Sequence, residues 1–290
     1  MGDPNQADDG AIGRLMADQV PSDTRQARQQ TRRQLITEAV MAEGSIRIED
    51  LAERFEISLM TAHRDLDELV SRGLLRKTRG VVSAAPTSLI EASDVYRSSR
   101  QAAEKTAIAE AAMDFVEPGQ AIFFDDSTTV LQMAPHLGEV TPLTVITNSL
   151  TLMNELNGVR DITLFALGGQ FHNWCNAFMG RLTTSTIARL RADTLFLSMA
   201  AVIDDMVFHQ SSEMVETKRA MFEAAARRIL LADHSKFERR ALHSLAPLTD
   251  FDVVIVDDGI PAHHLERMRA KGIEVVVAPV AKAGKRRQSA

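Results

Sequence analysis

Residues 48–83 read IEDLAERFEISLMTAHRDLDELVSRGLLRKTRGVVS. Leu51 and Phe55 lie one turn apart on the same face of a short predicted helix, because apolar residues four positions apart share one side of an α-helix. Ser58 is of a residue type that favours helix N-caps, and it predicts a second helix over residues 59–72. A short helix, a tight turn and a second helix in this order predict a helix-turn-helix.

The flanking residues extend this pattern in both directions. Residues 29–44 carry apolar side chains at helical spacing and end at a glycine, residues 46–48 are β-prone, and residues 74–83 form two β-prone pieces around a basic turn. Three helices followed by a basic hairpin are the order of a winged helix. We therefore assign residues 25–85 to a winged helix-turn-helix DNA-binding domain, which Pro86 ends.

The outward side of the second helix predicts the residues that contact DNA. Recognition helices read base edges mainly from their first turns, and an arginine pairs bidentately with guanine, so Arg64 is the predicted base-reading residue. An ion pair with Asp67 or Glu68 is an equally good interpretation of Arg64. The basic hairpin is expected to contact phosphates. The predicted DNA-binding residues are Ser58, Thr61, His63, Arg64, Arg76, Lys77 and Arg79.

After a polar segment at residues 86–102, expected to be a linker, short β-rich runs alternate with helical stretches. This alternation predicts an α/β domain over residues 103–280, with a largely parallel sheet wrapped by helices. Ligands bind such sheets at the carboxyl ends of the strands. The first predicted helix of the domain spans residues 103–115. The predicted strands are residues 121–124, 144–147, 162–167, 194–198, 229–232, 253–256 and 274–277.

The composition bounds the class of protein. The chain has 290 residues, 45% of them hydrophobic, which is enough for a small and a mid-sized domain with buried cores. The net charge of −6 argues against a wholly basic nucleic-acid coat. When the chain is divided into residues 1–24, 25–80 and 81–290, only the middle block carries an excess of bases, eleven against nine acids. Residues 1–24 are polar without periodicity and are expected to be a disordered leader, and residues 281–290 are expected to be a flexible tail.

Neither a membrane span nor a secretory signal is expected. The longest apolar runs fall far short of the roughly 18 to 20 residues that cross a bilayer, and no charged-then-apolar signal pattern opens the chain. We therefore expect a cytoplasmic protein with no membrane partner. Cys175, the single cysteine, excludes an internal disulfide, and packing is favoured over a metal site that it would share with His172.

Several pieces of the first domain match a family pattern at the right spacing: RQLI at 33–36, IEDLAERF at 48–55, Ser58, Thr61, RDL at 64–66 and GLL at 73–75. With these pieces the domain resembles the DeoR family of bacterial sugar-responsive transcription regulators. Residues 62–64 are Ala-His-Arg where the family commonly has a bulky aliphatic residue and two arginines, and residues 78–80 are Thr-Arg-Gly where the wing usually carries His-Gly-Gly. These departures imply a different operator sequence.

The second domain matches in FFDDSTT at 123–129, TNSL at 147–150, LGG at 167–169, FMG at 178–180, Glu213 to Arg219 and ADHSKF at 232–237. Residues 103–278 thereby resemble the same family, and the resemblance implies a fold related to ribose-5-phosphate isomerase and CoA-transferase-like domains. Family members usually show Asp-Ser-Gly-Thr-Thr where residues 125–129 are DDSTT, so Ser127 replaces the common glycine.

These pieces imply a cleft for a phosphorylated sugar. Backbone N–H groups at a helix N-terminus and nearby hydroxyls suit a phosphate, which Lys218 and Lys236 would neutralise, while carboxylates and Asn148 would bind sugar hydroxyls. For each residue taken singly, a turn cap or a surface ion pair is the alternative. The predicted effector-binding residues are Asp125, Asp126, Ser127, Thr128, Thr129, Asn148, Ser149, Gly168, Gly169, Glu213, Lys218, Asp233 and Lys236.

The resemblance implies a repressor of carbohydrate catabolism genes. It is expected to be a homo-oligomer, dimer or tetramer, that binds double-stranded operator DNA with an affinity controlled by a phosphorylated sugar. No cofactor and no catalytic residue is expected. The alternative is a sugar-phosphate isomerase-like enzyme fused to a DNA-binding domain, because acids and lysines in one cleft can move a proton. Residues 172–176 and 209–212 depart from the expected pattern, and ligand choice can differ in such loops.

Overall fold

The computed structural model describes residues 45–71, 75–84 and 100–281, together with residues 29, 32, 33, 35–37, 39, 40, 43, 97 and 98. The chain divides into two compact units, Met1–Ala85 and Pro86–Ala290. The expected leader, most of the expected linker and residues 282–290 of the expected tail lie outside the described residues. No helix among the described residues is both long and apolar enough to cross a membrane.

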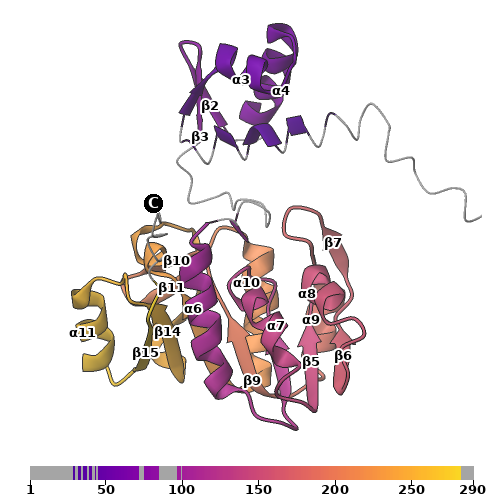
Figure 1. Cartoon of the computed structure of the whole chain (residues 1–290), viewed down its shortest axis with the longest axis vertical. Coiled ribbons are helices and arrows are strands. Elements are labelled where there is room, and N and C mark those ends of the chain that lie inside the picture. Colours follow the sequence, from indigo (N-terminus) through magenta and orange to yellow (C-terminus); the bar gives the residue numbers. More distant parts are fainter. Residues whose placement is uncertain are drawn as a thin grey trace, which may run out of the picture. The chain divides into compact units, whose positions relative to one another are not determined.

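The first unit is a small helical domain with a three-stranded antiparallel sheet, in the order β1-β3-β2 (Figure 1). The described positions between residues 29 and 43 are helical. The second helix begins at Ile48, a residue that the sequence analysis placed in a β-prone piece. Strand β1 ends at Arg47 because Arg47 pairs with Val81, the first residue of β3. The elements are β1 (Ser45–Arg47), α3 (Ile48–Arg54), α4 (Leu59–Ser71), β2 (Leu75–Thr78) and β3 (Val81–Ala84).

A buried carboxylate fastens α4 to the first helix of this unit. Ala62 and Leu66 of α4 are fully buried in the apolar core, and Asp65 between them is only 1% exposed. Arg32 and Arg33 donate to its two oxygens at 2.7 and 2.8 Å. A buried carboxylate is costly unless it is paired in this way, so these contacts fix the side of α4 that faces inward.

The second unit is built on a seven-stranded parallel sheet in the order β15-β14-β12-β9-β4-β5-β6 (Figure 1). Each of the seven predicted strands is present, and all six strand pairs are parallel. The strands are β4 (Ala121–Phe124), β5 (Leu143–Thr147), β6 (Ile162–Ala166), β9 (Ala192–Leu197), β12 (Ala225–Ala232), β14 (Val253–Asp257) and β15 (Glu274–Ala278).

Helices cover both faces of this sheet. Ile122 and Phe124 of β4 pack into the cluster under α6, α7 and α8, whereas Phe123 packs into the cluster under α9, α10 and α11. Figure 1 shows α6 and α10 on opposite sides of the strands. The helices are α6 (Ala102–Ala112), which continues as a 3₁₀ turn at Met113–Phe115, α7 (Ala134–Leu137), α8 (Leu150–Glu155), α9 (Arg181–Ile187), α10 (Ser212–Ala224) and α11 (Ala262–Ala270).

Further 3₁₀ turns and two small antiparallel sheets complete the unit. The 3₁₀ turns are Val130–Met133, His234–Glu238 and Leu248–Asp250. Strands β7 (Gln170–His172) and β8 (Ala177–Met179) form a hairpin that follows the end of β6. Strands β10 (Ala201–Ile203), β11 (Met206–His209) and β13 (His243–Pro247) form the second sheet, which follows the end of β9.

At one point in the sheet, the chain leaves two neighbouring strands toward opposite faces of the sheet. β4 and β9 are adjacent, yet the chain continues from β4 into helices on one face and from β9 into α10 on the other. In open α/β sheets, this switch point is where a crevice opens at the carboxyl ends of the strands. The loops after β4 and β9 are therefore the first place to look for a site.

Candidate functional site

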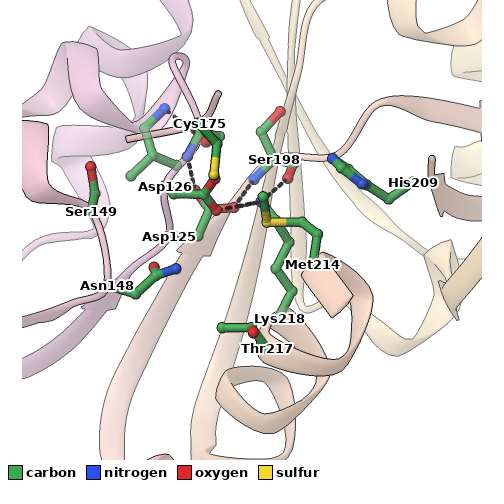
Figure 2. A network of polar contacts seen from close by, with 12 residues as sticks. Asp125, Asp126, Asn148, Ser149, Cys175, Ser198, His209, Met214, Thr217 and Lys218 are labelled. Atoms are coloured by element: carbon green, nitrogen blue, oxygen red, sulfur yellow. Dashed lines mark hydrogen bonds and ion pairs between the residues drawn. The ribbon is translucent and has the colours of Figure 1, made fainter. Parts of the chain in front are cut away.

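Asp125, the first residue after β4, organises the switch point. Its Oδ1 accepts the backbone N–H of Ser127 at 2.9 Å, and its Oδ2 accepts the backbone N–H of Ser198 at 2.9 Å. Lys218 of α10 donates to the same Oδ2 at 2.5 Å (Figure 2). One buried carboxylate thus ties together the loop after β4, the end of β9 and a helix of the far face.

The hydrogen bonds of Lys218 are made with the protein itself. Its Nζ also donates to the carbonyl of Ser198 at 2.9 Å and lies 3.4 Å from Asp126 Oδ1. Burial favours a low pKa for Lys218, but the Asp125 and Asp126 carboxylates outweigh it and hold the pKa above its usual value. Lys218 borders the crevice, as expected, but its charge balances Asp125 rather than standing open to a phosphate.

Lys105 of α6 reaches the hydroxyl-rich loop from the other side. This side chain is only 3% exposed and donates to Thr128 Oγ1 at 2.9 Å and to the carbonyl oxygen of Arg97. Burial, and then the neighbouring charge of Lys236, lower the pKa of Lys105 to about 7. Lys105, Lys236 and the loop hydroxyls therefore lie in one part of the site, which we call the cationic corner. Lys105 loses its positive charge there more easily than an exposed lysine does.

Lys236 follows β12, next to another buried carboxylate. Burial would raise the pKa of Asp233, but the charge of Lys236 and the hydroxyl of Ser235 outweigh it and lower the pKa. Asp233 Oδ1 accepts from both the backbone N–H (3.1 Å) and the hydroxyl of Ser235. Asp233 thus holds the turn that carries Lys236, and a 3₁₀ helix begins there.

A small pocket that is open to solvent lies at the switch point, next to these groups. Five of its lining residues were predicted from the sequence, and five were not. The predicted ones are Ser127, Thr128, Thr129, Lys218 and Lys236; the others are Arg97, Ser198, Met199, Ala200 and His209.

Other predicted residues lie beside this pocket in structural roles. Ser149 caps α8 by accepting the N–H of Leu152 at 3.2 Å, and Asn148 donates to the Phe178 carbonyl at 3.0 Å. The carbonyl of Gly168 accepts the Thr183 hydroxyl at 2.8 Å. A Cβ on Gly169 would lie 2.1 Å from that hydroxyl oxygen, so only glycine fits there.

Glu213 lies on α10, further along the same edge of the sheet. Its carboxylate is 3.4 Å from His172 Nε2 in the β7–β8 hairpin. Among the residues that the structure describes, no three His, Cys, Asp or Glu side chains gather as metal ligands would.

The outward face of α4 carries the polar residues expected to meet DNA. The Ser58 hydroxyl accepts the N–H of Thr61 at 3.2 Å and caps the helix, as predicted. Met60 is 82% exposed and Arg64 is exposed, one turn along. Asp67, one of two acids considered as an ion-pair partner for Arg64, instead pairs with Lys77 at 2.8 Å.

The wing is a hairpin with a two-residue turn. Arg79 and Gly80 both have positive φ, 49° and 78°, and connect Thr78 of β2 to Val81 of β3. Two residues in this conformation match the twist of the flanking strands. The turn projects the exposed Arg79, and Arg76 is exposed on the adjoining strand.

Two family models match these two units. The DeoR-like helix-turn-helix domain matches residues 32–87, and the DeoR C-terminal sensor domain matches residues 100–258. The chain belongs to the DeoR family. A DeoR-like helix-turn-helix followed by a DeoR sensor domain makes it a DNA-binding transcription regulator, with the fold that the sequence predicted.

Relatives in the DeoR family are named as repressors. A putative aga operon transcriptional repressor of Escherichia coli O157:H7 is 29% identical over 85% of this chain and 93% of its own length. The transcriptional repressor AccR of Agrobacterium fabrum is 32% identical over 79% and 90%. A lactose phosphotransferase system repressor of Staphylococcus epidermidis is 32% identical over 77% and 90%.

Among solved structures, the ribose 5-phosphate isomerase A of Methanocaldococcus jannaschii overlaps 46% of this chain and 53% of its own. The sequence identity is 17% and the TM-score is 0.34, a likeness from which no conclusion is drawn.

Proposed function

We propose that this DeoR-family regulator is a repressor of carbohydrate catabolism genes, and that a phosphorylated sugar releases it from operator DNA. The observation that carries the proposal is the switch-point pocket, where the hydroxyls after β4 face buried or partly buried cations. Such a corner suits a phosphate monoester, since charged donors and hydroxyls lie together there.

In this proposal the phosphate lies against Thr128 and Thr129, with Lys105 and Lys236 as its counter-charges. Lys105 already donates to Thr128, so a phosphate oxygen beside that hydroxyl would be within its reach. Arg97 lines the same pocket and adds a third cation. Asp125, which Lys218 contacts, holds the loop after β4 in place by accepting the backbone N–H of Ser127.

The DNA-binding side of the proposal rests on α4 and the wing. Thr61, His63 and Arg64 would meet base edges in the major groove, while Arg76, Lys77 and Arg79 would contact phosphates. Two copies in a homo-oligomer, dimer or tetramer, would bind two half-sites. The effector acts by having different affinities for the DNA-competent and DNA-released arrangements.

A binding screen followed by DNA binding tests this function. Thermal shift over phosphorylated pentoses and hexoses identifies effectors, and the effect of each hit on operator binding is then measured by fluorescence anisotropy. Lys236→Ala should reduce effector affinity about tenfold or more, since hydrogen bonds to charged groups contribute that much. If no sugar phosphate binds, or Lys236→Ala binds every hit as tightly as the wild type, the proposal is wrong.

One observation favours a second function, that of a sugar-phosphate isomerase. A lysine whose pKa lies near 7 beside buried carboxylates resembles the proton-transfer groups of enzymes. Incubation with ribose 5-phosphate and with other pentose and hexose phosphates separates the two functions. Steady turnover supports the isomerase, whereas saturable binding without conversion supports the sensor.

A further inference from the structure

Three buried acceptor oxygens beside the pocket receive no hydrogen bond from any residue that the structure describes. Two are the carboxylate oxygens of Asp126, whose side chain is 1% exposed, and the third is Oδ1 of Asn148, which is fully buried. A buried acceptor without a donor costs free energy, and buried polar groups in native structures nearly always have a partner. These oxygens therefore call for donors from outside the protein.

The three oxygens sit at the ends of neighbouring strands. Phe124 of β4 is level with Thr147 of β5, so Asp126 and Asn148 follow the two strands at the same edge of the sheet (Figure 2). Asn148 cannot turn its amide around without loss, because its Nδ2 donates to the Phe178 carbonyl at 3.0 Å. Its Oδ1 is thereby fixed as an acceptor.

The charges at this end of the site do not balance. Asp125 and Asp126 together face Lys218, which lies 2.5 Å from the first and 3.4 Å from the second. Lys218 is the cation in direct contact with the two carboxylates, so these three side chains together carry one excess negative charge. Lys105 and Lys236 supply positive charge near Thr128 and the pocket, so the site contains groups of both signs.

Asp126 is not itself a lining residue, but its chain neighbour Ser127 and its ion partner Lys218 both line the pocket. A small apolar cluster of Cys175, Ala177, Met179 and Met214 joins the β7–β8 hairpin to α10 near Asp126. Figure 2 shows Cys175 and Met214 in the view around Asp126. Because these oxygens are buried, a ligand group can reach them only if neighbouring side chains shift.

We infer that Asp126 and Asn148 form a donor-selective, anion-excluding subsite for the end of the effector remote from its phosphate. The occupant is a monophosphate whose other end presents hydroxyl or ammonium donors, and sugar bisphosphates are rejected. This inference rests on the proposed function. In the Asp-Ser-Gly-Thr-Thr pattern given above, a serine stands at the position of Asp126, so the charge is a feature of this chain.

The test compares each sugar monophosphate with its own bisphosphate. The probes are glucose 6-phosphate, fructose 6-phosphate, ribose 5-phosphate and the corresponding 1,6- and 1,5-bisphosphates, with inorganic phosphate as the reference for the cationic corner. Calorimetry on the full chain should show that at least one monophosphate binds about tenfold or more tightly than its bisphosphate. The cationic corner alone would favour the bisphosphate, because it carries more negative charge.

In Asp126→Asn the ratio of the affinities for the monophosphate and the bisphosphate should fall close to one, because the substitution removes the charge and keeps the shape of the side chain. Asp126→Ser is a second variant to measure if Asp126→Asn folds poorly. Thermal unfolding without ligand checks that both variants are folded. Asp114→Asn removes the same charge from an exposed position of the same unit and should leave the preference unchanged.

The inference is overturned if the wild type binds bisphosphates as tightly as monophosphates, if Asp126→Asn keeps the wild-type preference, or if inorganic phosphate binds and no monophosphate does. Failure of the proposed function gives a different result, in which neither inorganic phosphate nor any sugar phosphate binds.

Discussion

At the scale of single residues, two buried carboxylates organise the two units in the same manner. Asp65 accepts from Arg32 and Arg33 in the first unit, and Asp125 accepts from two backbone N–H groups and Lys218 in the second. Both are polar residues at positions where the pattern of the surrounding apolar residues predicts a buried side chain. Each joins segments far apart in the sequence, 32 to 33 residues for Asp65 and 93 for Asp125 with Lys218.

Sequence patterns predict such residues only in part. The family pattern pointed to Asp125 and Lys218 but not to their contact with each other. Lys105 escaped prediction, although it shares the inward face of α6 with Ile108 and Ala112, where a lysine is out of place. A charged residue in an apolar stripe was the available signal. Arg97 and Ser198 carried none, because only the folded sheet brings them to the pocket.

Proton uptake should accompany phosphate binding. The pKa of Lys105 lies at about 7, so the lysine is mostly neutral at pH 8 and charged at pH 6. A phosphate dianion favours the charged form, and with its own second pKa near 6 it brings no proton at pH 8. Calorimetry with an identified sugar phosphate at pH 8, in buffers of different ionisation enthalpy, should therefore show uptake of a proton, and affinity should fall as the pH rises through 7.

Lys105→Arg is the control, since a guanidinium stays charged throughout this range. It should bind the ligand without proton uptake, whereas Lys236→Arg should keep the uptake. Binding enthalpies of the wild type that do not depend on the buffer at pH 8 would contradict the assignment.

At the scale of elements, the sheet followed from the sequence almost completely. Parallel strands are buried on both faces and read as continuous apolar runs, such as Val253 to Val256, which stand out from their surroundings. The β7–β8 and β10–β11 hairpins did not, because strands of three or four residues are too short to show a period. His209 of β11 lines the pocket, so the sequence predicted the sheet that carries the site better than the short strands beside it.

The recognition helix gives a prediction of its own. Arg64→Ala should lose about 1 to 3 kcal/mol of discrimination between operator and random DNA, because a bidentate contact to guanine is specific. Lys77→Ala should weaken both complexes alike, since a phosphate contact carries no sequence information. Anisotropy titrations at fixed salt measure both effects. An Arg64 variant with unchanged operator preference would exclude it as a base reader.

At the scale of the whole molecule, the two units have separate cores and separate tasks. The helices and strands that carry the predicted DNA contacts all lie before residue 85, and the pocket lies after residue 96. The sequence indicated this division through the change from a single helix-rich block to alternating strands and helices. It carried no signal for how copies associate.

A fragment of residues 25–85 should bind operator DNA more weakly than the full chain. The reading elements are in the fragment, but we expect the contacts that hold two copies together to lie in the sensor unit. Joining two heads raises the effective concentration of the second after the first has bound. Competition titrations at matched salt compare the two proteins, and equal affinities would refute the expectation.

The cationic corner of the pocket has a consequence for the cell. The charge of Lys236 helps to lower the pKa of Lys105, so a phosphate that binds there would relieve a repulsion between the two lysines. Under the proposed function, inorganic phosphate would then compete for the same corner at all times. The regulator would report the ratio of effector to background phosphate, and its threshold would move with the phosphate status of the cell.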